Sequence, residues 1–455
     1  MLIKFAISNF LSFNTKQIFS MEAGKARKHS ARIYDSKIAK LTKCKTVFGA
    51  NASGKSNLIE AFNFVQTVVN DGFKAEYVNK YFRQNADNKN KDSVFEIEVL
   101  IDGKKMCYGF SVLLSNGTIN NEWLYEIMYS GTKKLLYERC TTEETFTIGE
   151  YFKNKDSINK LLNYGEDSTA DTDYLFLTII NNKKNKMYAE HLELNILKQT
   201  YEWFTHNLSI SFPSESLTGY PYFTDANLEE IAEILGALGT GVSSLQIVDV
   251  PTDAVRNKIP RELYNKIVSD LEKINLKAKS DETSEKPSIV ARAYKEFYKF
   301  EIDLEDRITI KTIEFGHENN NVFFNLNEES DGTARLLDLV EMFFDNAESR
   351  VFVIDEIDRC LHPAMTVKIL ELFLKRAERK NTQLIITCHE SRILAKDILR
   401  NDEILFVMKT VLGDSIINAL EKYQLRADKS VYAALFDGTL EALPIFNNER
   451  LEKLT

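Results

Sequence analysis

An eight-residue loop, Gly49-Ala-Asn-Ala-Ser-Gly-Lys-Ser56, constrains this chain more than any other feature of its sequence. It follows a short apolar run, Thr46 to Phe48, and precedes a helical pattern. Glycines at 49 and 54 let backbone N–H groups close around phosphate oxygens, the lysine neutralises their charge, and the final serine hydroxyl can ligate Mg²⁺. A plain Gly/Ser turn would not need this spacing, so the pattern predicts a nucleoside triphosphate site. Its predicted ligands are Gly49, Asn51, Ala52, Ser53, Gly54, Lys55, Ser56 and Asn57.

Length and composition limit the class of protein. The 455 residues allow two or three structural units, or one large domain with an insertion, since single cores stop growing near about 250 to 300 residues. Hydrophobic residues make up 44% and charged residues 27%, which is typical of a globular protein. No apolar run approaches the roughly 20 residues of a membrane span and no secretory signal is evident, so we expect a cytoplasmic protein without a membrane partner. Five scattered cysteines without a CxxC pair argue against a disulfide framework or structural zinc.

Periodicity divides the chain into four predicted segments of one α/β fold. Residues 1–155 combine a β-ribbon, the phosphate loop with its helix, and an antiparallel β meander punctuated by turns. Residues 156–303 have a mainly helical pattern and are interpreted as an insertion. Residues 304–420 return to strand patterns, including apolar runs typical of strands buried on both faces. Residues 421–455 are expected to be a tail that packs on this domain or on a partner.

Two carboxylates end a buried strand in the second half of the chain. Val351-Phe-Val-Ile354 leads directly into Asp355 and Glu356. This placement suits a carboxylate in the Mg²⁺ shell beside Ser56 and a second one against an attacking water. Alone, such a pair would be weak evidence. After a complete phosphate loop in the same chain, it is the expected partner.

Two further segments carry polar groups that suit a γ-phosphate. Glu329-Ser-Asp-Gly-Thr333 precedes a helix, so that Ser330, Gly332 and Thr333 offer a hydroxyl, a glycine N–H and a helix N-terminus. An ordinary N-cap is the alternative interpretation of this segment. His389 follows another buried strand, where its imidazole could contact the γ-phosphate, although a single histidine in this position is usually structural.

The order of these elements resembles the head of ABC-type ATPases. The resemblance implies an α/β P-loop ATPase head with a mixed core sheet, an antiparallel meander and a helical insertion. In that family the signature acts in trans, so that two heads sandwich two ATP molecules; this implies an ATP-dependent homo-oligomer. The motifs match residue by residue: Lys55 and Ser56 in the phosphate loop, Asp355 with Ser56 for Mg²⁺, Glu356 as general base, Ser330, Gly332 and Thr333 as trans signature, Asp358 in the loop crossing the dimer interface, and His389 as switch histidine.

A narrower resemblance is to the RloA-like abortive-infection ATPases of bacterial anti-phage defence, the group that includes the ATPase of the PARIS system. It is carried by Asn9-Phe-Leu-Ser-Phe13, GANASGKSNL, ESDGTARLL, DEIDRCLHP and the end from Tyr432 to Phe446. These matches span nearly the whole chain, and only the helical insertion contributes little specific signal to the resemblance. Members of this group are encoded with a TOPRIM-type nuclease, which the ATPase holds inactive until a phage trigger protein releases it. The resemblance implies these partners for this chain.

Two departures and two rival functions stay open. DNA-repair heads of the SMC-like branch carry an arginine where this chain has Leu11, and Gln84 is only a weak candidate for the Q-loop glutamine. An SMC-like DNA clamp is the main alternative, since the run from Lys25 to Lys45 is basic, although the net charge of −9 and the absence of coiled-coil heptads speak against it. Direct nucleic-acid binding therefore remains open. A transport-coupled ATPase would need a membrane partner and is the weakest alternative.

Overall fold

The computed structural model describes the chain except residues 27, 183–184, 214–226, 281–287, 294, 304–306, 318–321, 345–348, 424–429 and 441–455. It divides into two units. The first comprises Met1–Ile210, Ala347–Ile357 and Leu374–Thr455; the second comprises Ser211–Asn346 and Asp358–Phe373. Within the described part of the chain, none of the helices combines the length and the apolar composition that a membrane crossing requires.

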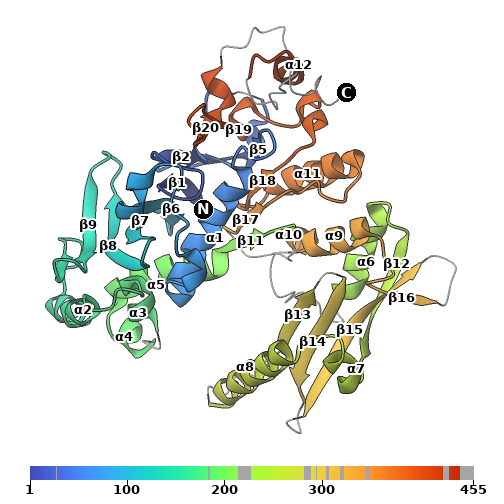
Figure 1. Ribbon diagram of the computed structural model, residues 1–455, viewed down its shortest axis with the longest axis horizontal. Helices are drawn as coiled ribbons and strands as arrows, with labels where there is room; N and C mark the ends of the chain where they lie inside the picture. The colour runs from blue at the N-terminus through green and yellow to red at the C-terminus, as the bar shows by residue number, and fades with distance from the viewer. Residues whose placement is uncertain are drawn as a thin grey trace. The chain divides into compact units, whose positions relative to one another are not determined.

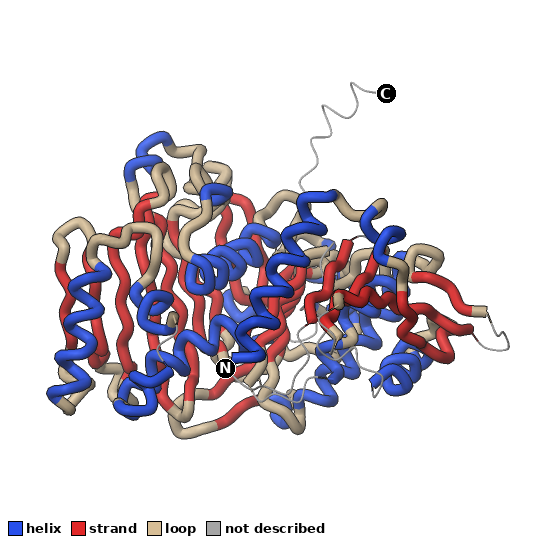
Figure 2. The backbone as a smooth tube through the Cα atoms, turned by 90° about the horizontal axis from the view of Figure 1, so that it is seen from below, coloured by secondary structure: helices blue, strands red, loops and turns tan. Residues whose placement is uncertain are grey.

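A seven-stranded antiparallel sheet forms one layer of the first unit (Figures 1 and 2). Its order is β10 (Thr145–Ile148), β9 (Lys133–Cys140), β8 (Thr118–Ile127), β7 (Lys104–Leu113), β6 (Ser93–Ile101), β1 (Leu2–Ser8) and β2 (Gln17–Ser20). Turns at Gly103 and Gly117, whose φ angles of 73° and 82° favour glycine, separate its central strands. The predicted meander is confirmed.

The second sheet of this unit carries the phosphate loop. Its order is β11 (Leu208–Ser211), β17 (Val351–Ile354), β18 (Gln383–Thr387), β5 (Cys44–Phe48), β19 (Ile404–Lys409) and β20 (Ser415–Ala419). From β17 to β19 neighbouring strands are parallel, and β20 returns antiparallel to β19. Because the carboxyl ends of parallel strands meet at one edge, the segments that follow β17, β18, β5 and β19 gather there.

One helix joins the two sheets. α1 (Lys55–Asp71) begins at the end of the loop after β5, and its aromatic side chains pack on the seven-stranded sheet. The Phe62 ring lies 4.3 Å from the Phe5 ring, and the Phe64 ring lies 4.8 Å from the Phe95 ring. All four side chains are buried. This apolar face fixes the direction in which the helix N-terminus points.

Residues 156–303 are rich in helices, as predicted, but they also contain strands and are divided between the two units. Their first helices, α2 (Lys155–Ser168), α3 (Phe176–Asn181), α4 (Asn185–Glu190) and α5 (Asn195–Glu202), belong to the first unit, where α3 contacts α1. The second unit contains an antiparallel sheet in the order β12 (Val242–Asp249), β15 (Ile308–His317), β14 (Glu296–Ile302), β13 (Ser288–Ala293), with β16 (Phe323–Asn325) paired to β15. The helical periodicity of residues 261–276 dominates the pattern of this segment, so the shorter strand-like alternation that ends at Ile302 was not predicted.

Helices complete the second unit. α8 (Arg261–Ser280) lies along β13 and β14 (Figure 1), and Tyr264 and Leu271 pack with Phe300 in a common core. α6 (Leu228–Ala237) contacts both β12 and α9 (Asp331–Leu339). The unit also contains the short α7 (Thr252–Arg256) and α10 (Glu341–Phe344) and the first part of α11 (Pro363–Ala377). The predicted segment 304–420 is thus divided between the units, since α9 belongs to the second and β17 to the first.

The last predicted segment lies only partly within the described residues. α12 (Val431–Phe436) contacts the short helix η7 (Ser391–Ala395), so this part of the tail packs on the first unit. Residues 441–455, which include the last part of the Tyr432 to Phe446 end, lie outside the described residues. α11 (Pro363–Ala377) continues the chain from one unit into the other.

The basic run near the N-terminus is partly internal: Lys25, Lys28, Lys37 and Lys40 are exposed, whereas three other cations are buried. Arg32, Lys43 and Lys45 are 5%, 4% and 3% exposed. The Arg32 guanidinium donates to the Ile398 carbonyl over 2.6 Å, the Lys43 ammonium donates to the Ala377 carbonyl over 2.7 Å, and the Lys45 ammonium donates to the Asp402 carbonyl. Burial lowers the pKa of Lys45. These three cations therefore stabilise the fold and are not presented to a nucleic acid.

Candidate nucleotide site

The loop between β5 and α1 has the backbone shape of an anion cradle. Gly49 and Gly54 have φ angles of 159° and 110°, and Ala52 lies in the left-handed region at 61°. A Cβ on Gly49 would collide with the Val407 carbonyl, and one on Gly54 would collide with the Ser415 hydroxyl. Only glycine fits at these two positions. The first turn of α1 has no side-chain cap, so its N–H groups are available to an anion.

Two side chains of the loop point to a phosphate ligand. The buried Lys55 ammonium donates to the carbonyls of Gly49 and Ala50 over 2.8 and 3.1 Å, which places its charge inside the curve of the loop. The Ser53 hydroxyl is buried and has no hydrogen-bond partner among the described residues. Buried hydroxyls are normally paired, so this one fits a ligand oxygen. The loop residues therefore fit the triphosphate that their spacing predicts.

Thr387 links the two carboxylates at the end of β17. Its hydroxyl donates to Asp355 Oδ1 over 2.5 Å and accepts a hydrogen bond from the Glu356 N–H over 2.8 Å. Asp355 is 3% exposed, whereas Glu356 is 34% exposed at its side chain. The backbone of Glu356 is left-handed, with φ of 46°, a strained conformation for a residue with a Cβ. This turn sends the two neighbouring carboxylates in different directions.

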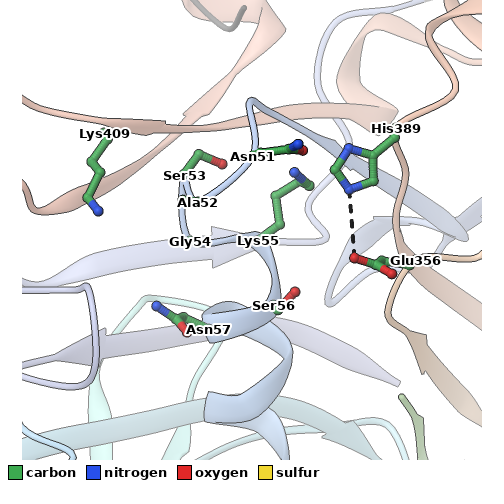
Figure 3. A pocket seen from close by; sticks show the side chains of 10 residues that line it. All are labelled: Asn51, Ala52, Ser53, Gly54, Lys55, Ser56, Asn57, Glu356, His389 and Lys409. Atoms are coloured by element: carbon green, nitrogen blue, oxygen red, sulfur yellow. Dashed lines mark ion pairs between the residues drawn. The ribbon is translucent and has the colours of Figure 1, made fainter. Parts of the chain in front are cut away.

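His389 faces Glu356 across the cavity. Its Nε2 lies 3.9 Å from Glu356 Oε1, as Figure 3 shows. The cavity has a volume of about 730 Å³ and is lined by Asn51, Ala52, Ser53, Gly54, Lys55, Ser56, Asn57, Glu356, His389 and Lys409. The phosphate loop, the predicted base and the predicted switch histidine thus share one hollow of the first unit. An imidazole at this distance can hold the carboxylate or respond to a charge placed between them.

The residues available for a metal ion are few. Among the described residues no group of three or more histidine, cysteine, aspartate or glutamate side chains could hold a metal ion. The Ser56 hydroxyl lines the loop cavity, whereas the buried Asp355 carboxylate, which does not line it, follows β17 at the same sheet edge. Mg²⁺ commonly binds through one or two protein oxygens together with substrate phosphates, so this donor set fits that ion. It does not fit a permanently caged metal.

The Asn9 to Phe13 segment braces the loop from outside. Phe10 and Phe13 exchange backbone hydrogen bonds of 2.9 and 2.8 Å in a tight turn that exposes Ser12. Asn57 donates to the Ser12 hydroxyl over 2.8 Å. The Ser415 hydroxyl lies 2.8 Å from the Ser12 hydroxyl and donates to the Ser53 carbonyl over 2.6 Å. The N-terminal motif therefore holds the loop through hydroxyl groups.

The predicted signature belongs to the second unit. Ser330 caps α9, because its hydroxyl accepts the Thr333 N–H over 3.0 Å and lies 2.9 Å from the Thr333 hydroxyl. A Cβ on Gly332 would lie 3.1 Å from the Cys360 carbonyl, so glycine allows a close approach here. Ser330, Gly332 and Thr333 line a cavity of about 490 Å³ with Cys360 and His362. Asp358 accepts the Leu361 N–H through its carbonyl over 3.1 Å, in the turn that precedes this cavity wall.

The structure thus places the predicted residues in two groups. Gly49, Asn51 to Asn57, Asp355, Glu356 and His389 belong to the first unit, whereas Ser330, Gly332, Thr333 and Asp358 belong to the second. Sequence reasoning missed Thr387, Ser12 and Ser415. Thr387 ends a strand that was recognised, and hydroxyls at the carboxyl ends of parallel strands are a usable signal. Gln84 does not line the loop cavity; it lies against Gly413 beside a second cavity.

A family model described as "AAA domain, putative AbiEii toxin, Type IV TA system" matches residues 46–395, a range that includes every predicted site residue. No curated protein matches the chain.

Three similar solved structures are SMC head domains. The Smc head bound to the C-winged helix domain of ScpA is 16% identical, with 92% of this chain and 98% of that chain covered and a TM-score of 0.41. The SMC head domain from Thermotoga maritima is 14% identical, with 92% and 98% covered and a TM-score of 0.34. The Smc head with an extended coiled coil bound to the C-terminal domain of ScpA, derived from Pyrococcus furiosus, is 16% identical, with 92% and 97% covered and a TM-score of 0.41.

Proposed function

The chain belongs to the AAA-domain family described for AbiEii-type toxin–antitoxin systems, and from this premise we propose that it is an Mg²⁺-dependent ATPase that controls a separate effector in anti-phage defence. The observation that carries the ATPase proposal is the single hollow shared by the phosphate loop, Glu356 and His389. A triphosphate in this hollow would meet a cation, helix N–H groups and a carboxylate suited to water. These are the parts that phosphoryl transfer requires.

Each side chain has a defined task in this proposal. Lys55 and the first turn of α1 bind the phosphates, and Ser56 with Asp355 would hold Mg²⁺, which neutralises charge on the β- and γ-phosphates. Glu356 accepts a proton from water as the water oxygen bonds to the γ-phosphorus and the bond to the β,γ-bridging oxygen breaks. The His389 imidazole orients the Glu356 carboxylate and contacts the γ-phosphate. Thr387 keeps both carboxylates in place, as its two hydrogen bonds support.

Completion of the site requires a second copy of the chain. The Ser330 hydroxyl, the Gly332 N–H and the N-terminus of α9 lie at a cavity whose lining includes no residue of the phosphate loop. In the proposal these groups bind the γ-phosphate held by another subunit, and Asp358 lies in the loop that crosses the interface. ATP binding is thereby coupled to homo-oligomer formation, in dimeric units that can be built into a larger ring.

The biological role is the finer part of the proposal. The ATP-bound oligomer is the armed state that holds a TOPRIM-type nuclease, and a phage trigger protein releases it. The family description, which concerns a toxin–antitoxin system, supports a role in defence of this general kind. The protein would act in the cytoplasm, where the effector and its substrate meet.

The decisive experiment compares Glu356→Gln with wild type. We expect the variant to bind ATP with little change in affinity, to lose nearly all turnover, and to remain as an ATP-bound oligomer in light-scattering mass measurements. Glu138→Gln, at an exposed position of β9, is the matched control with the same loss of charge. Rapid hydrolysis by Glu356→Gln would remove Glu356 from the base role. If the light-scattering mass of the wild type were the same with and without ATP, the two-chain site would be contradicted.

The DNA-clamp alternative makes a different prediction. Duplex DNA would stimulate its ATPase activity, and binding would weaken steeply with salt because phosphate contacts release counterions. Three cations of the basic run are buried, which removes part of the sequence evidence for this role. Salt-sensitive DNA binding by the purified protein, with stimulated turnover, would favour the clamp over the sensor.

A further inference from the structure

Lys409 is a cation that the proposed chemistry has not used. It is the last residue of β19, it is exposed, and the structure gives its ammonium group no ion-pair or hydrogen-bond partner among the described residues. β19 lies parallel and next to β5, with Phe406 opposite Phe48. Lys409 therefore extends three residues beyond that pair, at the sheet edge where the phosphate loop begins.

The neighbouring strand fixes the position of Lys409 relative to the loop. Its cross-strand partner in the β19–β20 hairpin is Ser415. The Ser415 hydroxyl donates to the Ser53 carbonyl over 2.6 Å, so the hairpin is tied directly to the loop. Figure 3 shows Lys409 and His389 on opposite sides of the loop. Strand β18 thus supplies one side of the cavity and strand β19 supplies the other.

This arrangement gives a bound nucleotide a direction. The γ-phosphate must lie toward Glu356 and His389, because these are the groups suited to water attack. The opposite end of the triphosphate then lies toward Asn57 and Lys409. Both residues also line a second cavity of about 470 Å³ in the same unit, and so connect the two hollows.

The second cavity offers contacts of another chemical kind. Tyr81 and Phe82 line it together with the charged Glu76, Lys80 and Arg83 and with Leu11, which has a left-handed backbone with φ of 49°. The apolar Leu11 side chain supplies no charge for a phosphate. Aromatic rings in a mixed lining next to the Lys409 ammonium group suit a nucleoside attached to a phosphate, because a ring can stack on the base while the ammonium group binds the charge.

We propose that Lys409 binds the phosphate closest to the ribose and that the nucleoside lies in the second cavity, against Tyr81. This proposal rests on the proposed function, since it requires a triphosphate in the phosphate loop. It assigns the orientation of the nucleotide and a second phosphate ligand from the β19–β20 hairpin. Lys409 is then a ligand that determines affinity, and Tyr81 separates nucleotides from bare polyphosphate.

The test uses the full chain and two probes measured by calorimetry with Mg²⁺ present. AMP-PNP carries both the nucleoside and a phosphate chain that resists hydrolysis, whereas inorganic tripolyphosphate carries only the chain. For Lys409→Met we expect about tenfold weaker binding of both probes, with recovery in Lys409→Arg. For Tyr81→Ala we expect about tenfold weaker binding of AMP-PNP and an unchanged affinity for tripolyphosphate. Lys396→Met, at an exposed position outside both cavities, is the control for the lost charge.

The outcomes separate this proposal from the one on which it rests. Wild-type binding of AMP-PNP with no effect of Lys409→Met or Tyr81→Ala would overturn the orientation and leave the ATPase proposal intact. Equal weakening by Lys396→Met would show a general charge effect and would also overturn the assignment of Lys409. Failure of the wild type to bind either probe would overturn both proposals. Loss of AMP-PNP affinity alone in Tyr81→Ala supports the nucleoside position.

Discussion

The Thr387 hydroxyl, at the end of β18, lies 2.5 Å from Asp355 Oδ1 and so orients the buried carboxylate that follows β17. The same oxygen accepts the N–H of Glu356 over 2.8 Å. One hydroxyl therefore orients the proposed Mg²⁺ ligand through its side chain and the proposed base through its backbone. Since neither contact touches the nucleotide, Thr387 is a positioning residue whose effect should appear in turnover.

Replacing Thr387 by valine tests this relationship. Valine keeps the shape but removes the hydroxyl, which leaves the buried Asp355 carboxylate without this donor and the Glu356 N–H without this acceptor. We expect kcat to fall by roughly tenfold to a hundredfold, with AMP-PNP affinity little changed and a higher Mg²⁺ concentration needed for half-maximal rate. Thr387→Ser should recover most of the rate. A valine variant with wild-type kcat would contradict the role.

Lys55 should determine whether a nucleotide binds at all. Lys55→Ala removes the ammonium group held at the Gly49 and Ala50 carbonyls. We expect at least about a hundredfold loss of ATP affinity, because a charge-assisted contact with phosphate is lost from a buried position. Lys16→Ala, at a side chain 59% exposed, controls for the lost charge. Unchanged ATP affinity in Lys55→Ala would count against the loop as the phosphate site.

Mixing two inactive variants tests whether the signature acts between chains. Ser330→Asp keeps an N-cap acceptor for α9 but sets a negative charge against the γ-phosphate. We expect Lys55→Ala and Ser330→Asp to be inactive separately and to recover up to about a quarter of wild-type turnover when mixed, because half the dimers would contain one intact site. Ser330→Asn, a neutral cap, is the control for the charge. No recovery from well-folded variants would place the signature in the same chain's site.

Glu403 should make stability depend on pH. It is fully buried, and burial raises its pKa from 4.5 to about 7. The folded chain then binds more protons than the unfolded chain between these values, so this group's contribution to stability is present at low pH and is lost as pH rises through that window.

Replacing Glu403 by glutamine should remove that dependence. Glutamine can still accept the hydrogen bond from the Arg400 N–H. We expect Glu403→Gln to exceed wild type in stability by about 3 kcal/mol at pH 8, with the difference vanishing below about pH 4. Melting midpoints of both proteins across this range measure the difference, and buried Lys45, whose pKa is lowered, is common to both. A constant difference at all pH values would contradict the shifted pKa.

The sequence was most informative where short motifs dictate backbone shape. Gly49 and Gly54 predict a cradle because other residues collide there, and the apolar run from Val351 to Ile354 predicts a buried parallel strand that delivers Asp355 and Glu356. It was less informative about the second unit. β12 pairs with the distant β15, and the alternation of β13 and β14 is short compared with the helical pattern of α8.

Contacts between distant segments were beyond what local patterns contain. Ser12 and Ser415 are 403 residues apart, yet their hydroxyls lie 2.8 Å from one another beside the loop. Nothing in the spacing around either serine indicates this pairing, because it arises from the order of strands in two sheets. Lys409 was missed for the same reason: its position follows from β19 lying beside β5.

The left-handed backbone of Glu356 sets the stability of the fold against the proposed catalytic role of this residue. Glycine or asparagine would adopt a φ of 46° with less strain, so a glutamate here costs the folded state about 1 kcal/mol. In the proposed function this carboxylate activates water, which is a reason to keep glutamate at a strained position. Stability and the proposed turnover therefore make opposite demands on position 356. In a chain selected only for heat resistance, we would expect this glutamate to be replaced first, with loss of the proposed activity.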